Sequence, residues 1–179
     1  MFLLRHGQSH FNLHFNKTRV DPGIVDPALT PEGQRQIHAA AQDLKTRNIT
    51  RIIASPYQRT LESAALVAEA LRLPIEVDPL VRERYYFSCD IGSPRPRLEE
   101  SWPDLDFAAL DHQWWPDDEE LEPAVQQRCQ QFSETMRQRR DWRACLVVTH
   151  WGFIRGLTQQ EVPNGAIVPF DLQAALAPS

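Results

Sequence analysis

Short apolar runs alternate with amphipathic stretches along the chain, and this alternation predicts an α/β fold. Apolar and β-branched residues cluster at 1–4, 49–54 and 144–149, which indicates buried strands. A possible strand covers 75–81, and a last one covers 167–172. Strands that alternate with helices are typical of a sandwich built on a largely parallel sheet.

Helices are predicted where apolar residues recur every three or four positions. The predicted helices cover residues 30–44, 55–71, 123–136 and 151–160. Thr30 and Ser55 are the expected N-caps of the first two helices, because each is followed by a proline suited to the first helical position.

Periodicity is weak in the segment 82–122, which we predict to be a loop-rich insert within a single domain of 179 residues. Prolines interrupt most of this segment. Its tryptophans either line a substrate mouth or cover the core; they are Trp102, Trp114 and Trp115. The acidic run 117–120 is expected to complement the dipole of the helix that begins near Pro123.

Composition narrows the class of protein. With 42% hydrophobic and 24% charged residues, the chain resembles an ordinary globular domain. A formal charge of −5 gives no basic field for nucleic acid or an anionic membrane. We expect a cytoplasmic protein, since we find neither a signal-peptide pattern nor a long apolar span. The widely spaced Cys89, Cys129 and Cys145 are expected to be reduced, buried thiols.

Polar residues suited to one site follow three of the predicted strands. They are Arg5 and His6 after the first strand, Arg59 after the second, and His150 after the strand at 144–149. In open α/β sheets, ligands bind beyond the carboxyl ends of the strands. We therefore expect these side chains to converge.

The converging residues suit a phosphate dianion. Arginine binds phosphate oxygens through a planar fork, helix N-termini add partial positive charge, and Asn12 offers a further amide donor. A neutral imidazole can attack phosphorus, and the surrounding cations stabilise the transferring phosphoryl group, so no metal or other cofactor is expected. The leaving alkoxide needs a proton, and Glu83 is the best-placed acid.

Four segments, in order, resemble motifs of the histidine phosphatase superfamily, also called the phosphoglycerate-mutase-like family. The segments are Arg5-His6-Gly7-Gln8-Ser9 with Asn12, then 26–34, 53–60 and 147–152. The resemblance implies a three-layer α/β/α sandwich and a phosphohistidine on His6. It also implies contacts of Arg5, Arg59 and His150 with the phosphoryl group of a small substrate, assisted by Asn12.

The acid is the point at which the chain departs from the family pattern. Leu80-Val81-Arg82-Glu83 is similar to the family's leucine-then-glutamate segment, which implies that Glu83 is the proton donor. Many members continue with a Gly-x-x-Glu-Gly stretch, whereas this chain has Phe87-Ser88-Cys89-Asp90-Ile91-Gly92. Asp90 is therefore a rival acid.

Two further patterns have alternative interpretations. His6, His10 and His14 recur every four residues, as in a metal-binding helix, but such a helix would have to run through Gly7 directly from a strand. Several arginines of the insert either select an additional anionic group on the substrate or are simply solvated. They are Arg82, Arg84, Arg95 and Arg97.

The predicted function is a phosphomonoesterase in which water removes the phosphoryl group from His6. A mutase, which returns the phosphoryl group to a bound sugar acid, uses the same chemistry. The resemblance implies that mutases are longer and carry extra basic residues, so 179 residues and an acidic insert favour hydrolysis. A third alternative is a non-catalytic sensor of a phosphorylated ligand. Nothing in the sequence indicates an oligomeric state.

Overall fold

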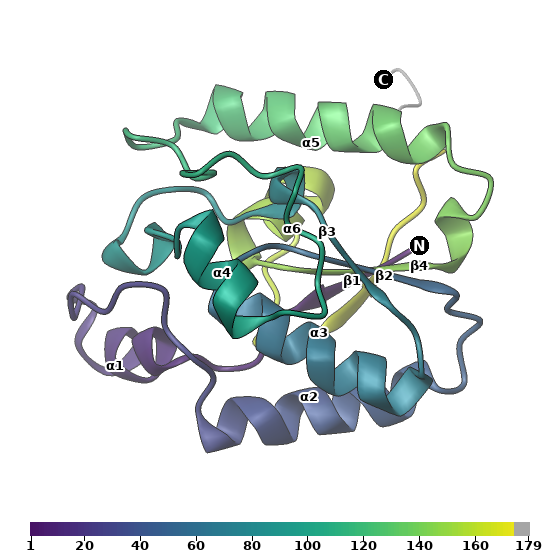
Figure 1. The fold of residues 1–179 in the computed structure, drawn as a ribbon, viewed down its shortest axis with the longest axis horizontal. Coiled ribbons are helices and arrows are strands. Elements are labelled where there is room, and N and C mark those ends of the chain that lie inside the picture. The colour runs from purple at the N-terminus through teal and green to yellow at the C-terminus, as the bar shows by residue number, and fades with distance from the viewer. Residues whose placement is uncertain (174–179) are drawn as a thin grey trace.

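The computed structural model describes residues 1–173 and contains a five-stranded sheet in the order β3-β2-β4-β1-β5 (Figure 1). The strands are β1 (Phe2–Arg5), β2 (Arg51–Ala54), β3 (Ile75–Val77), β4 (Cys145–Thr149) and β5 (Ile167–Pro169). β4 pairs in parallel with β1 and β2, β3 is parallel to β2, and β5 is antiparallel to β1. The predicted mostly parallel sheet is confirmed.

Helices cover both faces of this sheet, which confirms the three-layer sandwich (Figure 1). α2 (Pro31–Leu44) and α3 (Gln58–Leu71) pack together on one face. α5 (Glu122–Arg137) and α6 (Trp151–Thr158) pack together on the other. β4 lies between them and is buried along its whole length: Leu146 and Val148 belong to the core under α2 and α3, and Val147 to the core under α5. Burial on both faces explains its uninterrupted apolar sequence.

Two helices were not predicted, because neither has an apolar stripe. α1 (His10–Thr18) buries only Phe11, and α4 (Arg95–Ser101) buries only Leu98. α1 begins with a capping box, in which the Ser9 hydroxyl accepts from the Asn12 N–H and the Asn12 side chain accepts from the Ser9 N–H. The start of α1 is thus encoded in side-chain hydrogen bonds and not in hydrophobic periodicity.

One of the two predicted N-caps is correct. The Thr30 hydroxyl accepts from the Gly33 N–H at 3.0 Å at the start of α2. The prediction for Ser55 is wrong: α3 begins at Gln58 with Tyr57 as its N-cap. The Ser55 N–H continues the pairing with β4, and its hydroxyl lies 2.8 Å from His150 Nε2. Ser55 therefore bonds with β4 through its backbone and with His150 through its side chain, and it does not cap α3.

The tryptophans of the insert cover the core. Trp114 is buried in the cluster under α2 and α3, and Trp102 and Trp115 pack against it, partly buried. The three cysteines are free and buried, as predicted. Within residues 1–173, no helix is long and apolar enough to span a bilayer.

Candidate active site

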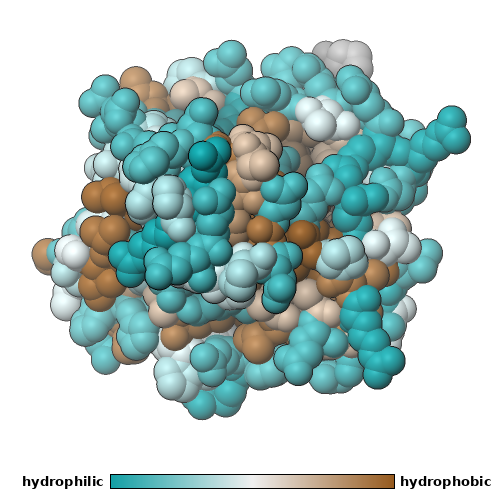
Figure 2. Space-filling model, in the orientation of Figure 1, coloured by the Kyte–Doolittle hydropathy of each residue, from teal (hydrophilic) through white to brown (hydrophobic). Residues whose placement is uncertain are grey.

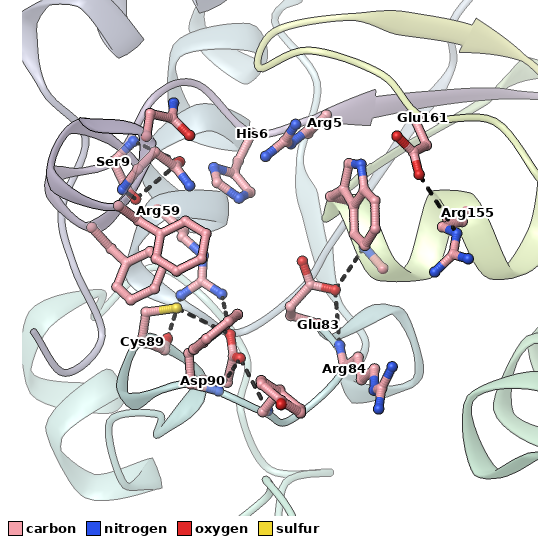
Figure 3. A pocket seen from close by; sticks show the side chains of 18 of the residues that line it. Arg5, His6, Ser9, Arg59, Glu83, Arg84, Cys89, Asp90, Arg155 and Glu161 are labelled. Atoms are coloured by element: carbon pink, nitrogen blue, oxygen red, sulfur yellow. Dashed lines mark hydrogen bonds and ion pairs between the residues drawn. The ribbon is translucent and has the colours of Figure 1, made fainter. Parts of the chain in front are cut away.

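A cavity of about 560 Å³ lies at the carboxyl ends of the parallel strands (Figure 3). Most of the predicted site residues line it: Arg5, His6, Asn12, Arg59, Glu83 and the rival acid Asp90. His150 does not line the cavity but packs against His6, with 5.1 Å between the ring centroids. The expected convergence at the strand ends therefore takes place.

His6 directly follows β1 and is held as a neutral imidazole. Its backbone N–H donates to the Thr149 carbonyl oxygen at 3.0 Å, and the residue is buried, with 3% exposed. Nδ1 lies 2.7 Å from the Gly7 carbonyl oxygen. Since a carbonyl only accepts, Nδ1 carries the proton and Nε2 keeps its lone pair. Burial, and then the charges of Arg59 and Arg5, hold the pKa of His6 well below its ordinary value.

The two arginines lie beside His6. Arg59, in the first turn of α3, donates to the Cys89 carbonyl oxygen at 2.6 Å and pairs with Asp90 at 3.1 Å. Arg5 donates to the Val162 carbonyl oxygen at 2.6 Å. A guanidinium has five N–H groups, so both side chains keep donors for a phosphate. The Asp90 carboxylate also explains how the Arg59 cation is tolerated at a buried helix start.

His150 directly follows β4, the middle strand of the sheet, and is fully buried. Its Nε2 bonds with the Ser55 hydroxyl, while its Nδ1 has no hydrogen-bond partner within the described chain. Burial, followed by the charge of Arg59, holds the pKa of His150 well below its ordinary value. Two neutral imidazoles therefore lie edge to face, and that of His6 is the one that lines the cavity.

Glu83 and Asp90 differ in the freedom of their oxygens. Glu83 Oε1 accepts the N–H groups of Arg84 and Gly152, both at 2.8 Å, and Oε2 has no hydrogen bond within residues 1–173. Asp90 uses both oxygens, because Oδ1 pairs with Arg59 and Oδ2 accepts two backbone N–H groups. Burial, and then the charge of Asp90, raises the pKa of Glu83 to about 7. Burial raises the pKa of Asp90 too, so it is the free Oε2 that makes Glu83 the better candidate to carry a proton.

The N-terminus of α6 holds this acid. Gly152 is the second residue of the helix, and a Cβ at this position would lie 2.2 Å from Glu83 Oε1. Only glycine allows the carboxylate to reach the backbone N–H. The sequence predicts helix N-termini that face a phosphate, but the N-terminus of α6 faces the Glu83 carboxylate.

Sequence reasoning missed the support behind Glu83. Arg128 of α5 donates to the carbonyl oxygens of Leu80 and Arg82 at 2.8 Å, and at 3.4 Å to that of Glu83. Its guanidinium makes two hydrogen bonds to Glu120, at 3.0 and 2.6 Å. Glu120, which belongs to the acidic run before α5, is therefore a buried ion-pair partner of Arg128. The signal in the sequence that could have found this support is Arg128 itself, which lies beside the apolar stripe of α5.

Asn12 fixes the loop that follows His6. Its Oδ1 accepts from the Ser9 N–H at 3.1 Å and from Asn164 Nδ2 at 3.2 Å. The same Asn164 amide donates to the His6 carbonyl oxygen at 3.1 Å. Asn164, which sequence reasoning did not single out, therefore ties the backbone of His6 to Asn12.

The positions of the other arginines and histidines show which of them can reach the cavity. Of the insert arginines, Arg84 lines the cavity, whereas Arg82 pairs with Glu120 at 2.9 Å. His10 and His14 are exposed on α1, and His6 lies outside that helix. Among the described residues no group of three or more His, Cys, Asp or Glu is placed to hold a metal ion.

Comparison with known proteins identifies the family of this chain. The model of the histidine phosphatase superfamily (branch 1) matches residues 1–173. Over 83 residues the chain is 39% identical to the "Probable phosphoglycerate mutase GpmB" of Yersinia enterocolitica and 36% identical to that of Proteus mirabilis. Each match covers 46% of this chain and 37% of the relative, so it spans little more than a third of the relative's length.

Solved structures share the fold. A mycobacterial glucosyl-3-phosphoglycerate phosphatase complexed with VO3 aligns with a TM-score of 0.65 and 23% identity over 93% of this chain and 88% of that one. A phosphoserine phosphatase from Entamoeba histolytica, complexed with 3-phosphoglyceric acid, aligns with a TM-score of 0.61 and 20% identity over 93% of this chain and 87% of that one. Because the family model spans the whole described chain, the protein belongs to the histidine phosphatase superfamily.

Proposed function

We propose that the protein is a metal-independent phosphomonoesterase in which His6 is the nucleophile. The observation that carries this proposal is the neutral, buried imidazole of His6, whose Nδ1 is held by the Gly7 carbonyl so that Nε2 keeps its lone pair. Arg5 and Arg59 supply positive charge beside this nitrogen, and Glu83 lies across the same cavity (Figure 3).

The proposed reaction has two steps. Arg5 and Arg59 bind the phosphoryl oxygens, and His6 Nε2 attacks phosphorus while the bond to the ester oxygen breaks. Protonated Glu83 gives its proton to the leaving alkoxide. In the second step water attacks the phosphohistidine, the Glu83 carboxylate takes a proton from that water, and inorganic phosphate leaves. His6 and Glu83 return to their starting states.

The family resemblance also assigns His150 to the phosphoryl group. Its buried Nδ1, which has no partner within residues 1–173, is the atom available for that bond. Its Nε2 is already engaged by Ser55. Asn12 assists by holding the loop that carries the nucleophile.

The decisive experiment is phosphate release from p-nitrophenyl phosphate by the wild type and by His6→Ala. We expect a loss of at least about 10³-fold, because the variant lacks the group that forms the covalent intermediate. A phosphorylated wild-type protein, trapped in alkali and mapped to His6 by mass spectrometry, should be absent in the variant. His38→Ala, at an exposed position on α2, is the matched control. Equal rates for wild type and His6→Ala would exclude His6 as the nucleophile.

A second candidate function is phosphoryl transfer between two positions of a phosphoglycerate. It is suggested by the relatives from Yersinia enterocolitica and Proteus mirabilis, which are named as probable phosphoglycerate mutases. Incubation with 3-phosphoglycerate distinguishes the two functions: a mutase forms 2-phosphoglycerate faster than free phosphate, and a phosphatase does the reverse. If neither product and no adduct forms while the ligand still binds, the protein is a sensor.

A further inference from the structure

The cavity is much larger than the phosphate end of the site requires. Its volume of about 560 Å³ falls in the range of pockets that enclose a whole small-molecule ligand. The residues that contact a phosphoryl group in the proposed reaction form only one end. The rest of the cavity must therefore accommodate the alcohol part of the substrate.

Aromatic side chains from two distant parts of the chain form one wall of this outer region, while a further lining ring, that of Trp151, lies beside Arg155 at 5.3 Å. Phe11 and Phe15 come from α1, and Tyr86 and Phe87 come from the insert; we call these four residues the aromatic wall. The Phe15 and Phe87 rings have centroids 4.9 Å apart, and Tyr86 meets Phe87 at 4.7 Å. Phe11 stacks with Phe15 at 5.3 Å.

Packing explains only part of this wall. Phe11 is buried, with 4% exposed, and anchors α1. Phe15 and Phe87 are only partly buried, and 55% of Tyr86 is exposed. Apolar side chains also come to the surface at the left edge of Figure 2, where α1 and the neighbouring part of the insert meet. Apolar rings exposed beside a polar site are typical of a ligand groove.

The rim of the cavity gives little support for a second anionic group. Arg84 pairs with Glu119 at 3.1 Å, and Arg155 lies 4.0 Å from Glu161. Arg84 also lies over the Tyr86 ring at 5.4 Å. A small acidic substrate such as a phosphoglycerate would have to displace these carboxylate partners. The third outer arginine of the cavity, Arg19, lies over the Phe15 ring at 5.8 Å.

We propose that the substrate is a phosphomonoester of an alcohol that carries an aromatic ring, and that this ring stacks on Phe15, Tyr86 and Phe87. Aromatic rings interact favourably edge to face or offset, and burial of the ring against this wall removes apolar surface from water. The expected turnover of this ester rests on the proposed function, whereas the expected binding of its ring to the aromatic wall does not.

Two alkyl esters with similar leaving groups test the proposal. We expect kcat/KM for 2-phenylethyl phosphate to exceed that for propyl phosphate by at least tenfold, mainly through KM. Cyclohexylethyl phosphate should fall between them, since it is apolar but not planar. Equal kcat/KM values for the ring-bearing and ring-free esters, or a preference for 3-phosphoglycerate, would overturn the proposal.

Substitutions in the aromatic wall should remove this preference. In Phe87→Ala, and in Tyr86→Ala at the exposed position, the ratio of the two kcat/KM values should fall at least fivefold. Phe170→Ala, which changes a partly buried ring outside the cavity, should keep the wild-type ratio. A ratio that is unchanged in both wall variants contradicts the proposal even where one of them is poorly folded.

Binding to the His6→Ala variant separates this inference from the proposed function. Calorimetric titration with the same esters should give at least tenfold tighter binding of 2-phenylethyl phosphate. If the wild type shows no turnover but the ring preference in Kd is present, the phosphatase proposal fails and the substrate inference stands. If turnover is present without ring preference in Kd or KM, the inference fails alone.

Discussion

The side of the cavity that holds His6, the proposed nucleophile, and the side that holds Glu83, the proposed acid, are built in different ways; we call them the nucleophile side and the acid side. His6 follows a buried parallel strand, and its backbone and ring are fixed by Thr149 and Gly7, which belong to the sheet or its edge. Glu83 lies in the insert and is fixed from other elements, by Gly152 at the start of α6 and by Arg128 of α5. The position of His6 is thus a property of the sheet, whereas the position of Glu83 depends on how residues 82–122 pack against α5 and α6.

Glu83→Gln should produce the largest difference between substrates that need the proposed acid and substrates that do not. The proton that Glu83 supplies matters for an alkoxide but hardly for p-nitrophenolate, which leaves without one. We expect kcat/KM to fall about 10²- to 10⁴-fold for an alkyl phosphate and about tenfold or less for p-nitrophenyl phosphate. Steady-state rates on both esters measure this difference.

Asp90→Asn is the companion to that experiment. Asp90 pairs with Arg59, so its loss should lower kcat/KM for both esters to a similar extent. A selective loss on the alkyl ester in Asp90→Asn, but not in Glu83→Gln, would transfer the acid role to Asp90.

Gly152→Ala should disturb the acid side alone. The added methyl would lie where Glu83 Oε1 sits, so the carboxylate must move away from the backbone N–H. We expect a loss of roughly 10- to 100-fold in kcat/KM for alkyl phosphates. The rate of p-nitrophenyl phosphate hydrolysis serves as the internal control, and an equal loss on both esters would mean that the whole site has shifted.

A smaller effect is expected from Arg128→Lys, which weakens the support of the acid without touching substrate. The first step needs protonated Glu83, so wild-type kcat/KM should fall as pH rises above about 7. Looser packing brings water to Glu83, lowers its pKa and moves this basic limb to lower pH, with about a tenfold loss of kcat/KM at pH 7. Arg137→Lys, exposed on the same helix, should leave the profile unchanged.

The two sides should also differ in the pH dependence of stability, which is the smallest effect. The lowered pKa values of His6 and His150 mean that the unfolded state binds protons first as pH falls below about 6.5, so the free energy of unfolding decreases there. Glu83 acts in the opposite sense, because its raised pKa makes stability fall as pH rises from about 4.5 to about 7.

Denaturant titrations from pH 5 to pH 8 measure these slopes. His6→Asn should flatten the acid limb by up to about 1 kcal/mol per pH unit. Glu83→Gln should instead gain stability over wild type towards pH 8. Parallel curves for wild type and both variants would show that neither group is buried as the structure indicates.

Local sequence was sufficient for the nucleophile side. The apolar run of β1 ends at Arg5 and His6, and that of β4 ends at His150, so the strand ends themselves place these residues at one edge of the sheet. Local sequence failed where no apolar stripe exists. α1 buries a single residue, and its start depends on the Ser9 and Asn12 capping box.

The acid side could not be derived in the same way. The bond from Arg128 to the Leu80 carbonyl joins residues 48 positions apart, and the bond from Gly152 to Glu83 joins residues 69 apart. No periodicity encodes such pairs, so the sequence left Glu83 and Asp90 as rivals. The tertiary structure distinguishes them through which carboxylate oxygens are already occupied.

The sequence by itself therefore determined the α/β class, the order of the motifs and the place of His6 at the end of the first strand, because hydrophobic periodicity and strand ends are local properties of the chain. Only the tertiary structure decided which carboxyl group is free to hold a proton and that aromatic rings from α1 and the insert form one wall. Those features depend on burial and on contacts between distant segments, which exist only after the chain has packed.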